Sequence, residues 1–315
     1  MKILFTSVGR RVELIQAYAN AAKKHGIELE IIGGDTSSIA PALKFCNRSV
    51  ILPRIKDETY IPFLIDFCDK EHVAALIPTI DTDLLVLAEN REKFGNTCTV
   101  ISDPDKIRIC RDKRFTAAYF MSIGLKSPAP VDDIKDYSDG FPAFIKPKDG
   151  SSSINAYKAD SKEELVALTK MVPDYIIQPF VSGTEYTIDI FCDFEGNPVF
   201  ITPRIRLAVR SGEVLKTKIV QDEKIINEMK RLIADYKPHG AITVQMIRDE
   251  RTGDDYYIEI NPRYGGGAPL SIKAGADSAE AMLHLLKGET IDYIPFAAED
   301  GAIYSRFDQS IRVDG

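Results

Sequence analysis

Short apolar runs alternate with amphipathic stretches over the first hundred residues. The runs at 3–6, 29–32, 50–52 and 74–77 are bounded by polar or glycine positions, whereas residues 12–22 carry apolar side chains at helical spacing. Short bounded runs are typical of buried strands, and the helical spacing predicts an amphipathic helix. Strands that alternate with helices predict an α/β domain with a doubly wound parallel sheet.

The pattern changes after Cys110, where β-type runs become longer. Alternating or β-branched runs predict strands at 143–145, 175–181, 186–191 and 200–210. Helical patterns occupy 113–124, 161–171, 222–236, 269–274 and 278–287. Ser161 and Glu164 form a capping box at the start of the second of these helices. The second half is therefore predicted to be α+β.

Residues 240–267 carry the densest chemical pattern in the chain. Two β-type runs, 241–247 and 256–261, flank a polar turn that contains Gly253, which predicts an antiparallel hairpin. Side chains alternate between the faces of a strand, so Glu259 and Asn261 are expected on one face, with Ile258 and Ile260 on the other. Gln245 can join the polar pair from across the hairpin.

Carboxamide and carboxylate oxygens on one face suit Mg²⁺ bound to a nucleotide phosphate. Arg263 and the glycines 265–267 follow at once, and a guanidinium can meet a transferring phosphoryl group in a forked geometry. A solvated hairpin face would show the same residue types, so this stretch alone leaves both interpretations open.

A second candidate site follows the strand predicted at 143–145. Lys146 stands at the end of that strand, and the small polar loop from Asp149 to Ser153 comes next. Such a loop can close over phosphate oxygens while the lysine supplies a positive charge, although a surface loop has the same composition. Further along, Gln178 and Glu185 suit a purine edge and ribose hydroxyls, or are ordinary strand residues.

Candidate substrate contacts lie in three other places. Three arginines, Arg204, Arg206 and Arg210, cluster in one predicted strand of an acidic chain, which favours an anion there. Asp81 and Asp83 follow a predicted strand and either cap the next helix or face a substrate cleft. Ser7, Arg10 and Arg11 follow the first strand.

An alternative for the first βαβ unit is dinucleotide binding. Asp35 ends the second strand, where an acidic residue can hold a ribose. The first turn, however, has only Gly9, and Arg10 and Arg11 stand where further glycines would let a pyrophosphate approach. The four histidines, at 25, 72, 239 and 284, are isolated in sequence and are expected to be structural or at the surface.

Composition narrows the class of protein. The chain has 315 residues and a net charge of -7 without a basic block, which argues against nucleic acid as a partner. Its five cysteines are scattered, so a reducing, cytoplasmic environment is expected rather than a disulfide framework. No apolar run approaches the roughly 20 residues of a membrane span, and the first residues lack a signal-peptide pattern.

Taken in order, these motifs resemble the ATP-grasp superfamily, and in particular a single synthetase unit of the carbamoyl phosphate synthetase large subunit. The motifs that carry the resemblance are the basic strand end at Lys146, the small-residue loop, the hinge strand followed by Glu185, and the sequence Glu-Ile-Asn-Pro-Arg at 259–263. The resemblance runs from Met1 to about Gly288. It implies three domains: 1–111, an α/β domain; 112–180, a lid; and 181–315, a central lobe with the metal site. The last two would be antiparallel-sheet lobes that clasp the nucleotide.

The resemblance also implies residue roles. Lys113 and Lys146 would contact the nucleotide phosphates, beneath a loop formed by Gly150, Ser151, Ser152 and Ser153. Gln178, with the backbone around Phe180 and Val181, would hold adenine, and Glu185 would bind ribose. Gln245, Glu259 and Asn261 would hold Mg²⁺, or Mn²⁺ in its place. Arg263, Lys146 and Arg210 are the predicted catalytic residues.

The predicted function is an ATP- and Mg²⁺-dependent ligase that converts a carboxylate into an acyl phosphate and couples it to an amine or another nucleophile. Its partners are small molecules, with no nucleic acid or membrane, and a homodimer is possible. Two alternatives stay open: an ATP-binding sensor without turnover, suggested by Gln245 and the glycine-poor loop, and a nicotinamide-dependent oxidoreductase, suggested by Asp35.

Overall fold

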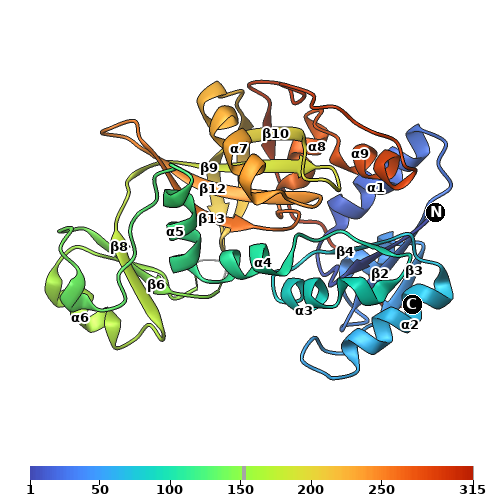
Figure 1. The fold of residues 1–315 in the computed structure, drawn as a ribbon, viewed down its shortest axis with the longest axis horizontal. Helices are drawn as coiled ribbons and strands as arrows, with labels where there is room; N and C mark the ends of the chain where they lie inside the picture. Colours follow the sequence, from blue (N-terminus) through green and yellow to red (C-terminus); the bar gives the residue numbers. More distant parts are fainter. Residues whose placement is uncertain (151–153, 315) are drawn as a thin grey trace.

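The computed structural model describes residues 1–150 and 154–314 and contains three β-sheets. Figure 1 shows the parallel sheet of the first hundred residues at one end, the small sheet with α6 (Lys162–Thr169) at the other, and the largest sheet between them. The predicted fold class, a doubly wound parallel sheet followed by antiparallel sheets, is confirmed.

The first sheet has five parallel strands in the order β3-β2-β1-β4-β5. The strands are β1 Lys2–Thr6, β2 Glu30–Asp35, β3 Arg48–Ile51, β4 Ala75–Pro78 and β5 Cys98–Thr99. The helices of this part are α1 Val12–Lys24, α2 Tyr60–Glu71, α3 Leu84–Glu89 and α4 Pro104–Arg111. The strand order reverses between β1 and β4, and such a switch point is where open α/β sheets bind ligands.

Alternation along β1 divides the apolar core in two. Ile3 and Phe5 pack on α1 and on the helices α8 (Ala268–Lys273) and α9 (Ser278–Leu286), while Leu4 packs on the other face with residues of α2 and α3. Residues at the start and near the end of the chain therefore share one core. Because α1 fills the space between the parallel sheet and α9, the first hundred residues are fixed against the rest of the protein.

The central sheet has six antiparallel strands in the order β13-β12-β9-β10-β11-β14. The strands are β9 Gly183–Cys192, β10 Pro198–Arg210, β11 Glu213–Ile219, β12 Ala241–Asp249, β13 Asp255–Asn261 and β14 Ile303–Ser305. Ile188 and Ile190 of β9 join a core that contains apolar residues of α7 (Glu223–Tyr236) and α5 (Lys113–Ser122). The opposite face is left for polar side chains at one end of the sheet.

The backbone at the start of β9 is in close contact with β12. A Cβ atom added to Gly183 would stand 1.9 Å from the carbonyl oxygen of Arg248, so only glycine fits there. Beside it, Ser182 accepts a backbone hydrogen bond from Glu250 at 3.1 Å and donates its hydroxyl to the Glu250 carboxylate at 2.8 Å. The chain is thus held to β12 at the point where it leaves the small sheet.

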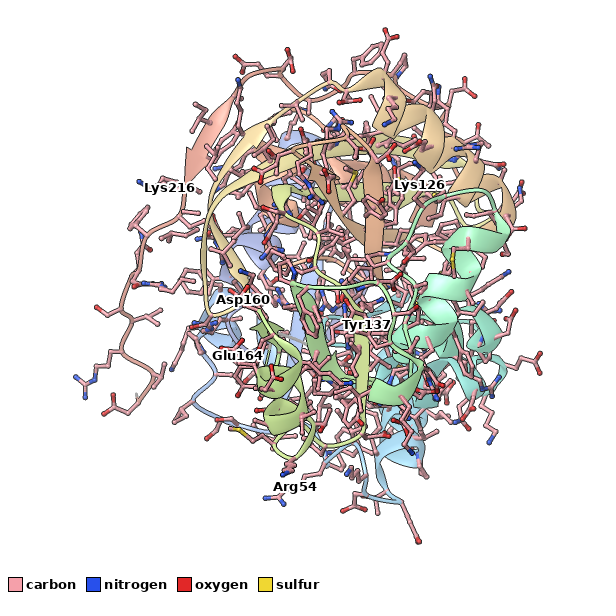
Figure 2. The ribbon with its side chains drawn as sticks, turned by 90° about the vertical axis from the view of Figure 1, so that its left-hand side faces the viewer. Arg54, Lys126, Tyr137, Asp160, Glu164 and Lys216 are labelled. Atoms are coloured by element: carbon pink, nitrogen blue, oxygen red, sulfur yellow. The ribbon has the colours of Figure 1, made fainter. Side chains whose placement is uncertain are left out.

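The small sheet has the order β7-β6-β8, with β6 Ala143–Pro147, β7 Tyr157–Ala159 and β8 Tyr175–Pro179. The predicted capping box of α6 is confirmed on one side, because Ser161 Oγ accepts from the N–H of Glu164 at 3.2 Å. The Glu164 carboxylate reaches the N–H of Asp160 at 2.7 Å rather than that of Ser161, and Figure 2 labels this pair at the surface of the small sheet.

Most predicted elements occur within a few residues of their expected ends, but four strands and one α-helix of the described residues were not predicted. The strands β5, β7, β11 and β14 and the helix α4 are short or border other elements, so their sequence periods are weak. In the part of the chain that the structure describes, no helix combines the length and the apolar character that crossing a lipid bilayer requires.

Candidate functional site

A cavity of about 190 Å³ lies between the small sheet and the central sheet. Its walls include Lys113 at the start of α5, Lys146 on β6, and Gln245 and Glu259 from the hairpin of β12 and β13. Glu185 of β9 and Arg206 of β10 complete the polar lining. Residues that are distant in sequence therefore meet at one site, as their order had led us to expect.

Two lysines contribute positive charge to the cavity, in addition to Arg206. Lys146 is only 7% exposed, and the described residues offer its ammonium no hydrogen bond or ion pair, only the ring of Phe144 with its centroid 5.5 Å away. Burial lowers its pKa to about 8, Glu259 opposes that shift and Lys113 adds to it. Burial likewise lowers the pKa of Lys113, whose Nζ donates to the Gly150 carbonyl at 2.8 Å. A buried ammonium without a partner is favoured only if an anion joins it.

The three predicted metal ligands lie together on one face of the hairpin. Gln245 pairs directly with Glu259 across the two strands, and the amide of Asn261 donates to a Glu259 oxygen at 2.9 Å. The prediction that Ile258 and Ile260 both face away is correct only for Ile260, which is buried in the core. A bulge between Gln245 and Met246 shifts the register, and Ile258 lines the cavity.

Arg263 joins this hairpin to the parallel sheet. Its Nη2 donates to Asp81 at 2.5 Å and to the Asn261 amide oxygen at 3.3 Å. Asp81 follows β4, so the contact spans the two largest sheets. Arg263 Nε is buried without a hydrogen-bond partner in the described part of the chain, which leaves one donor available beside the proposed metal ligands.

The predicted adenine and ribose contacts are only partly brought to the cavity. Glu185 lines it and lies 3.3 Å from Arg206 Nε. Gln178 is 5% exposed and donates its amide to the Pro128 carbonyl at 2.6 Å. The N–H of Phe180 is bonded to Pro142, and neither Phe180 nor Val181 is part of the cavity wall. Their roles stay predictions.

The three arginines of β10 have three different environments. Arg204 is buried in an ion pair with Asp189 at 2.7 Å. Arg206 lines the cavity, donates to the amide oxygen of Gln245 at 3.1 Å, and has its pKa lowered mainly by burial. Arg210 is exposed and forms a two-point ion pair with Asp308. The structure thus separates the predicted anion cluster and does not bring Arg210 to the cavity wall.

The predicted phosphate loop is described only in part. Gly150 has φ 122°, a backbone conformation that favours glycine, and lines the cavity. Ser151, Ser152 and Ser153, which were predicted to cover the phosphates, lie outside the described residues.

The contacts of Asp35 and Asp83, two acidic candidates in the first domain, show what their carboxylates bind. Asp35 accepts the N–H groups of Gly9 and Ser37 at 2.8 and 2.9 Å, so its carboxylate holds the first loop together. Asp83 starts α3 without capping it through its side chain, contrary to the capping alternative. It is fully buried and accepts from Thr6 at 3.0 Å, and burial raises its pKa to about 6.

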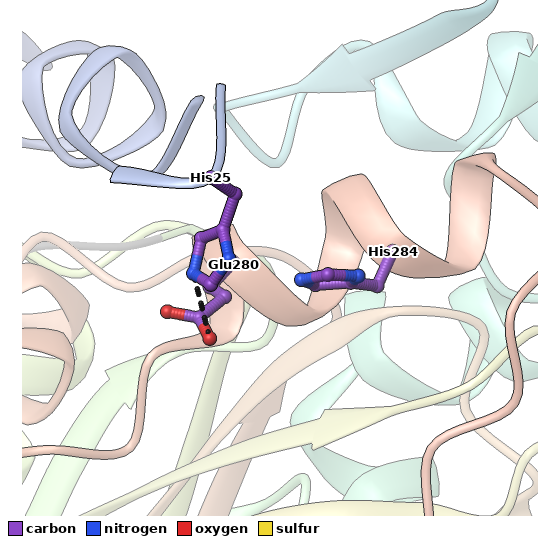
Figure 3. Close-up of side chains that lie close together, drawn as sticks. All are labelled: His25, Glu280 and His284. Carbon is purple, nitrogen blue, oxygen red and sulfur yellow. Dashed lines mark ion pairs between the residues drawn. The ribbon is translucent and has the colours of Figure 1, made fainter. Parts of the chain in front are cut away.

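Two of the four histidines, which are isolated in sequence, come together in the fold. His25 at the end of α1 and His284 of α9 come together with Glu280, and their ligand atoms lie within 4.8 Å of one another (Figure 3). Glu280 also pairs with Lys24 at 2.5 Å, and His284 pairs with Glu289 at 2.7 Å. We interpret this cluster as an ion-pair network between α1 and α9, because Lys24 already neutralises the carboxylate.

The apolar wall of the cavity was not among the predicted site residues. Phe144, Ile154, Met246 and Ile247 contribute to it. Phe144 lies two residues before Lys146 on β6, so strand alternation alone would have placed it on the lysine's face. An apolar wall beside buried lysines and acidic oxygens suits a nucleotide, which has an apolar base at one end and phosphates at the other.

Two family models match the chain. Residues 3–101 match the model described as PylC-like, N-terminal domain, and residues 171–306 match the model described as ATP-grasp in the biosynthetic pathway with Ter operon. The first covers most of the parallel-sheet domain, and the second covers most of the central sheet, including the hairpin and Arg263.

Two curated proteins illustrate the sequence likeness. A 3-methyl-D-ornithine–L-lysine ligase of Methanosarcina acetivorans is 30% identical over 234 residues, which are 73% of this chain and 61% of that protein. The N-terminal section of the carbamoyl phosphate synthase large chain of Aquifex aeolicus is 26% identical over 304 residues, 86% of this chain and 54% of that protein. The chain therefore spans between half and two thirds of the length of these relatives.

Among solved structures, the biotin carboxylase domain of the 2-oxoglutarate carboxylase from Hydrogenobacter thermophilus has a TM-score of 0.76 and 16% sequence identity. The match covers 96% of this chain and 73% of that domain, which was solved as a dimer with MgADP and bicarbonate. At this identity the likeness shows the fold alone.

Proposed function

Because the chain belongs to the ATP-grasp superfamily, we propose that it is an ATP- and Mg²⁺-dependent ligase that activates a carboxylate and couples it to an amine or another nucleophile. The observation that carries the proposal is the meeting, in one cavity, of two desolvated lysines with the oxygen face of the β12–β13 hairpin. Positive charge on one wall and metal-binding oxygens on the other are what a nucleotide triphosphate with its divalent ion needs.

In this proposal Lys113 and Lys146 bind nucleotide phosphates, and Glu185 binds ribose. Gln178 and the backbone near Phe180 and Val181 take the adenine. Lys146 supports this assignment best, since a phosphate would supply the charge partner that its surroundings lack.

Gln245, Glu259 and Asn261 would hold Mg²⁺. The donor set fits this ion, because all three side chains carry hard oxygen ligands and share one face of the hairpin. The bound ion would supply charge neutralisation between the nucleotide phosphates. The hydrogen bond from Arg206 to the Gln245 amide oxygen orients that ligand.

The chemistry follows from the weak electrophilicity of a carboxylate. A carboxylate oxygen attacks the γ-phosphorus of ATP, the bond to the β–γ bridging oxygen breaks, and ADP leaves with the electron pair. The acyl phosphate then reacts with an amine, which loses a proton as the C–N bond forms and inorganic phosphate departs. Arg263 faces the charge that develops on the transferring group, and exclusion of water by the small sheet limits hydrolysis of the acyl phosphate.

Turnover is tested by ADP release across a panel of carboxylates, each with and without amines. We expect substrate-dependent ADP release by the wild-type protein and at least about a hundredfold less by Lys146→Ala and Glu259→Ala, since the first loses a positive charge on the nucleotide phosphates and the second loses the charged ligand of the metal ion. Lys216→Ala is the matched control, because Lys216 is exposed on β11 and does not line the cavity.

Equal ADP release by all four proteins would contradict the proposal. Saturable MgATP binding without turnover on any carboxylate would instead support the sensor alternative. A homodimer stays a prediction, and light scattering on the purified protein measures it.

A further inference from the structure

Two imidazoles and a carboxylate meet between α1 and α9, at a place that the proposed function does not use. His25 follows the last residue of α1, whereas Glu280 and His284 lie one helical turn apart on α9 (Figure 3). One ligand atom of each lies within 4.8 Å of the others. Without a metal ion the cluster is held by ion pairs, but its geometry also fits a transition-metal ion.

The spacing of His25 and Glu280 matches that of two ligands on one ion. Nε2 of His25 lies 3.0 Å from Oε1 of Glu280. Two ligand atoms that are each about 2.1 Å from one ion stand about 3.0 Å apart in octahedral geometry and about 3.4 Å apart in tetrahedral geometry. An ion can therefore take the place of the proton between these atoms with little movement of either side chain.

His284 is oriented for a third ligand position. Its Nδ1 lies 2.7 Å from a Glu289 oxygen, which leaves Nε2 for an ion. The ring points toward His25 and Glu280 (Figure 3). A carboxylate on the second ring nitrogen is the arrangement that fixes the tautomer and the orientation of metal-binding histidines. Glu289 is itself held by Lys287 at 3.0 Å.

Lys24 competes with an ion for only one oxygen of Glu280. Its Nζ binds Oε2 at 2.5 Å, whereas His25 faces Oε1. The Lys24 side chain is 63% exposed, and such an exposed ion pair is weak, so the lysine can stay on Oε2 or move into water.

The three ligand side chains lie partly open to solvent. Those of His25, Glu280 and His284 are 29, 25 and 23% exposed, so an ion can enter from water while the helices hold its ligands in place.

We propose that a divalent transition-metal ion, Zn²⁺ in the first place, binds through Nε2 of His25, Oε1 of Glu280 and Nε2 of His284, with water in its remaining position. Two imidazoles and one carboxylate suit Zn²⁺, Ni²⁺ or Cu²⁺ better than Mg²⁺, which prefers oxygen ligands. The ion joins the end of α1 to α9 and so fastens the parallel sheet to the helices that follow the hairpin. None of the three ligands lines the nucleotide cavity, so this inference does not depend on the proposed function.

Binding is measured by calorimetric titration of ZnCl₂ into the purified protein, after removal of metals with a chelator. We expect one Zn²⁺ per chain with a Kd of about 1 µM or tighter, because the ligands are already assembled. The melting temperature should rise with the Zn²⁺ concentration. His25→Gln and His284→Gln should each bind at least about a hundredfold more weakly, since each loses a ligand. With Cu²⁺ as the probe, the electron paramagnetic resonance spectrum should show coupling to two imidazole nitrogens, and to one in either variant.

Two more variants distinguish a metal site from ion pairs alone. Glu289→Gln keeps all three ligands and removes the charge behind His284, so its affinity for Zn²⁺ should be about tenfold lower. Lys24→Gln removes the competitor for Glu280 and should bind Zn²⁺ at least as tightly as the wild type, although it breaks an ion pair.

His72→Asn is the matched control. His72 is exposed at the end of α2 with φ 53°, a left-handed conformation that asparagine tolerates. This variant should bind Zn²⁺ as the wild type does. Every variant should keep the melting shift that MgATP produces, because the nucleotide cavity lies elsewhere.

The inference is overturned if the wild-type protein binds no Zn²⁺, or if His25→Gln and His284→Gln bind it as tightly as the wild type, which would make the binding adventitious. Circular dichroism shows whether these two variants fold without metal. If they do not, Glu289→Gln and the Cu²⁺ spectrum of the wild type decide, and an unchanged affinity or coupling to fewer than two nitrogens overturns the inference as well.

Discussion

Lys146 is held in surroundings that favour its neutral form. Its pKa is lowered to about 8, so the ammonium loses its proton as the pH rises through that value in the nucleotide-free protein. Because the neutral amine attracts phosphate weakly, we expect the Kd for MgATP to rise about tenfold for each pH unit above 8. Lys146→Arg should remove this dependence, since arginine stays charged, and calorimetric titration between pH 6.5 and 9.5 measures both. An unchanged slope in the variant would assign the titration to another group.

Asp189 joins the central sheet to the segment that carries Arg263. It accepts from Arg204 at 2.7 Å and Ser271 at 2.6 Å, and Thr243, which contacts it at 3.4 Å, accepts the N–H of Gly265 at 3.1 Å. Asp189→Ala leaves the Arg204 charge buried and unpaired, so we expect the free energy of unfolding to fall by about 3–5 kcal/mol.

Urea denaturation measures this loss, and Asp308→Ala is the control. That substitution breaks the exposed pair with Arg210 and should have a much smaller effect. Similar losses in the two variants would show that burial does not set the energy of these ion pairs.

Local rules predicted which side chains share a face of a strand, but they did not predict partners that are distant in sequence. Alternation along a strand sufficed to bring Gln245, Glu259 and Asn261 together, because that rule is local. It could not separate Arg204 from Arg210, since their partners Asp189 and Asp308 are set by strand pairing and by the path of the tail. The meeting of His25 with His284 likewise depends on how α1 packs against α9.

Helix α1 is the element that connects the first sheet to the candidate site. Tyr18, in its middle, is fully buried, and its hydroxyl lies 3.0 Å from that of Tyr264, the residue after Arg263. The Tyr264 hydroxyl also donates to the carbonyl of Ser278, at the start of α9. The tyrosine pair therefore links α1 to the residue that follows Arg263.

We expect Tyr18→Phe to lower the free energy of unfolding by about 1 kcal/mol, because one buried hydrogen bond is lost while the ring remains. Equilibrium unfolding in urea measures the change. Tyr157→Phe is the matched control, since the hydroxyl of this exposed residue of β7 makes no hydrogen bond among the described residues. A loss of equal size in the control would refute the role given to the tyrosine pair.

Helices and strands with a clear hydrophobic period were predicted well. The candidate site, however, also depends on features that have no such period. The amphipathic pattern of residues 223–236 corresponds to α7, whereas the bulge in the β12–β13 pair places Ile258 where simple alternation did not. A bulge in a hairpin is not predictable from the sequence of either strand, because it depends on the register between the two strands.

At the scale of the molecule, the small sheet and the central sheet enclose a nucleotide-sized space, and the parallel sheet shares a core with the central sheet, so a bound ligand should stabilise the three together. With MgATP at a hundred times its Kd, we expect about 2.7 kcal/mol of stabilisation, visible as a higher melting temperature. NAD should give none, because Asp35 is already bonded to backbone N–H groups of its own loop. Protection by NAD but not by MgATP would favour the oxidoreductase alternative.

The division at residues 111 and 180 stays a prediction. The first and third of these regions share a core in which Phe5 and Tyr18 pack with Phe200 and Met282. A fragment of residues 1–111 would expose that apolar surface, so we expect it to bind hydrophobic dyes and aggregate, whereas a well-folded monomeric fragment would contradict the shared core.

The tight crossing at Gly183 has a consequence for recognising other chains of this kind. No side chain fits between the start of β9 and the carbonyl of Arg248. A substitution of Gly183 is therefore not tolerated as long as the two strands cross in this way. Distantly related chains with the same crossing should still have glycine two residues before the residue equivalent to Glu185, the proposed ribose contact. An ancestor or homologue with a larger residue there would have to route its chain differently between the two sheets.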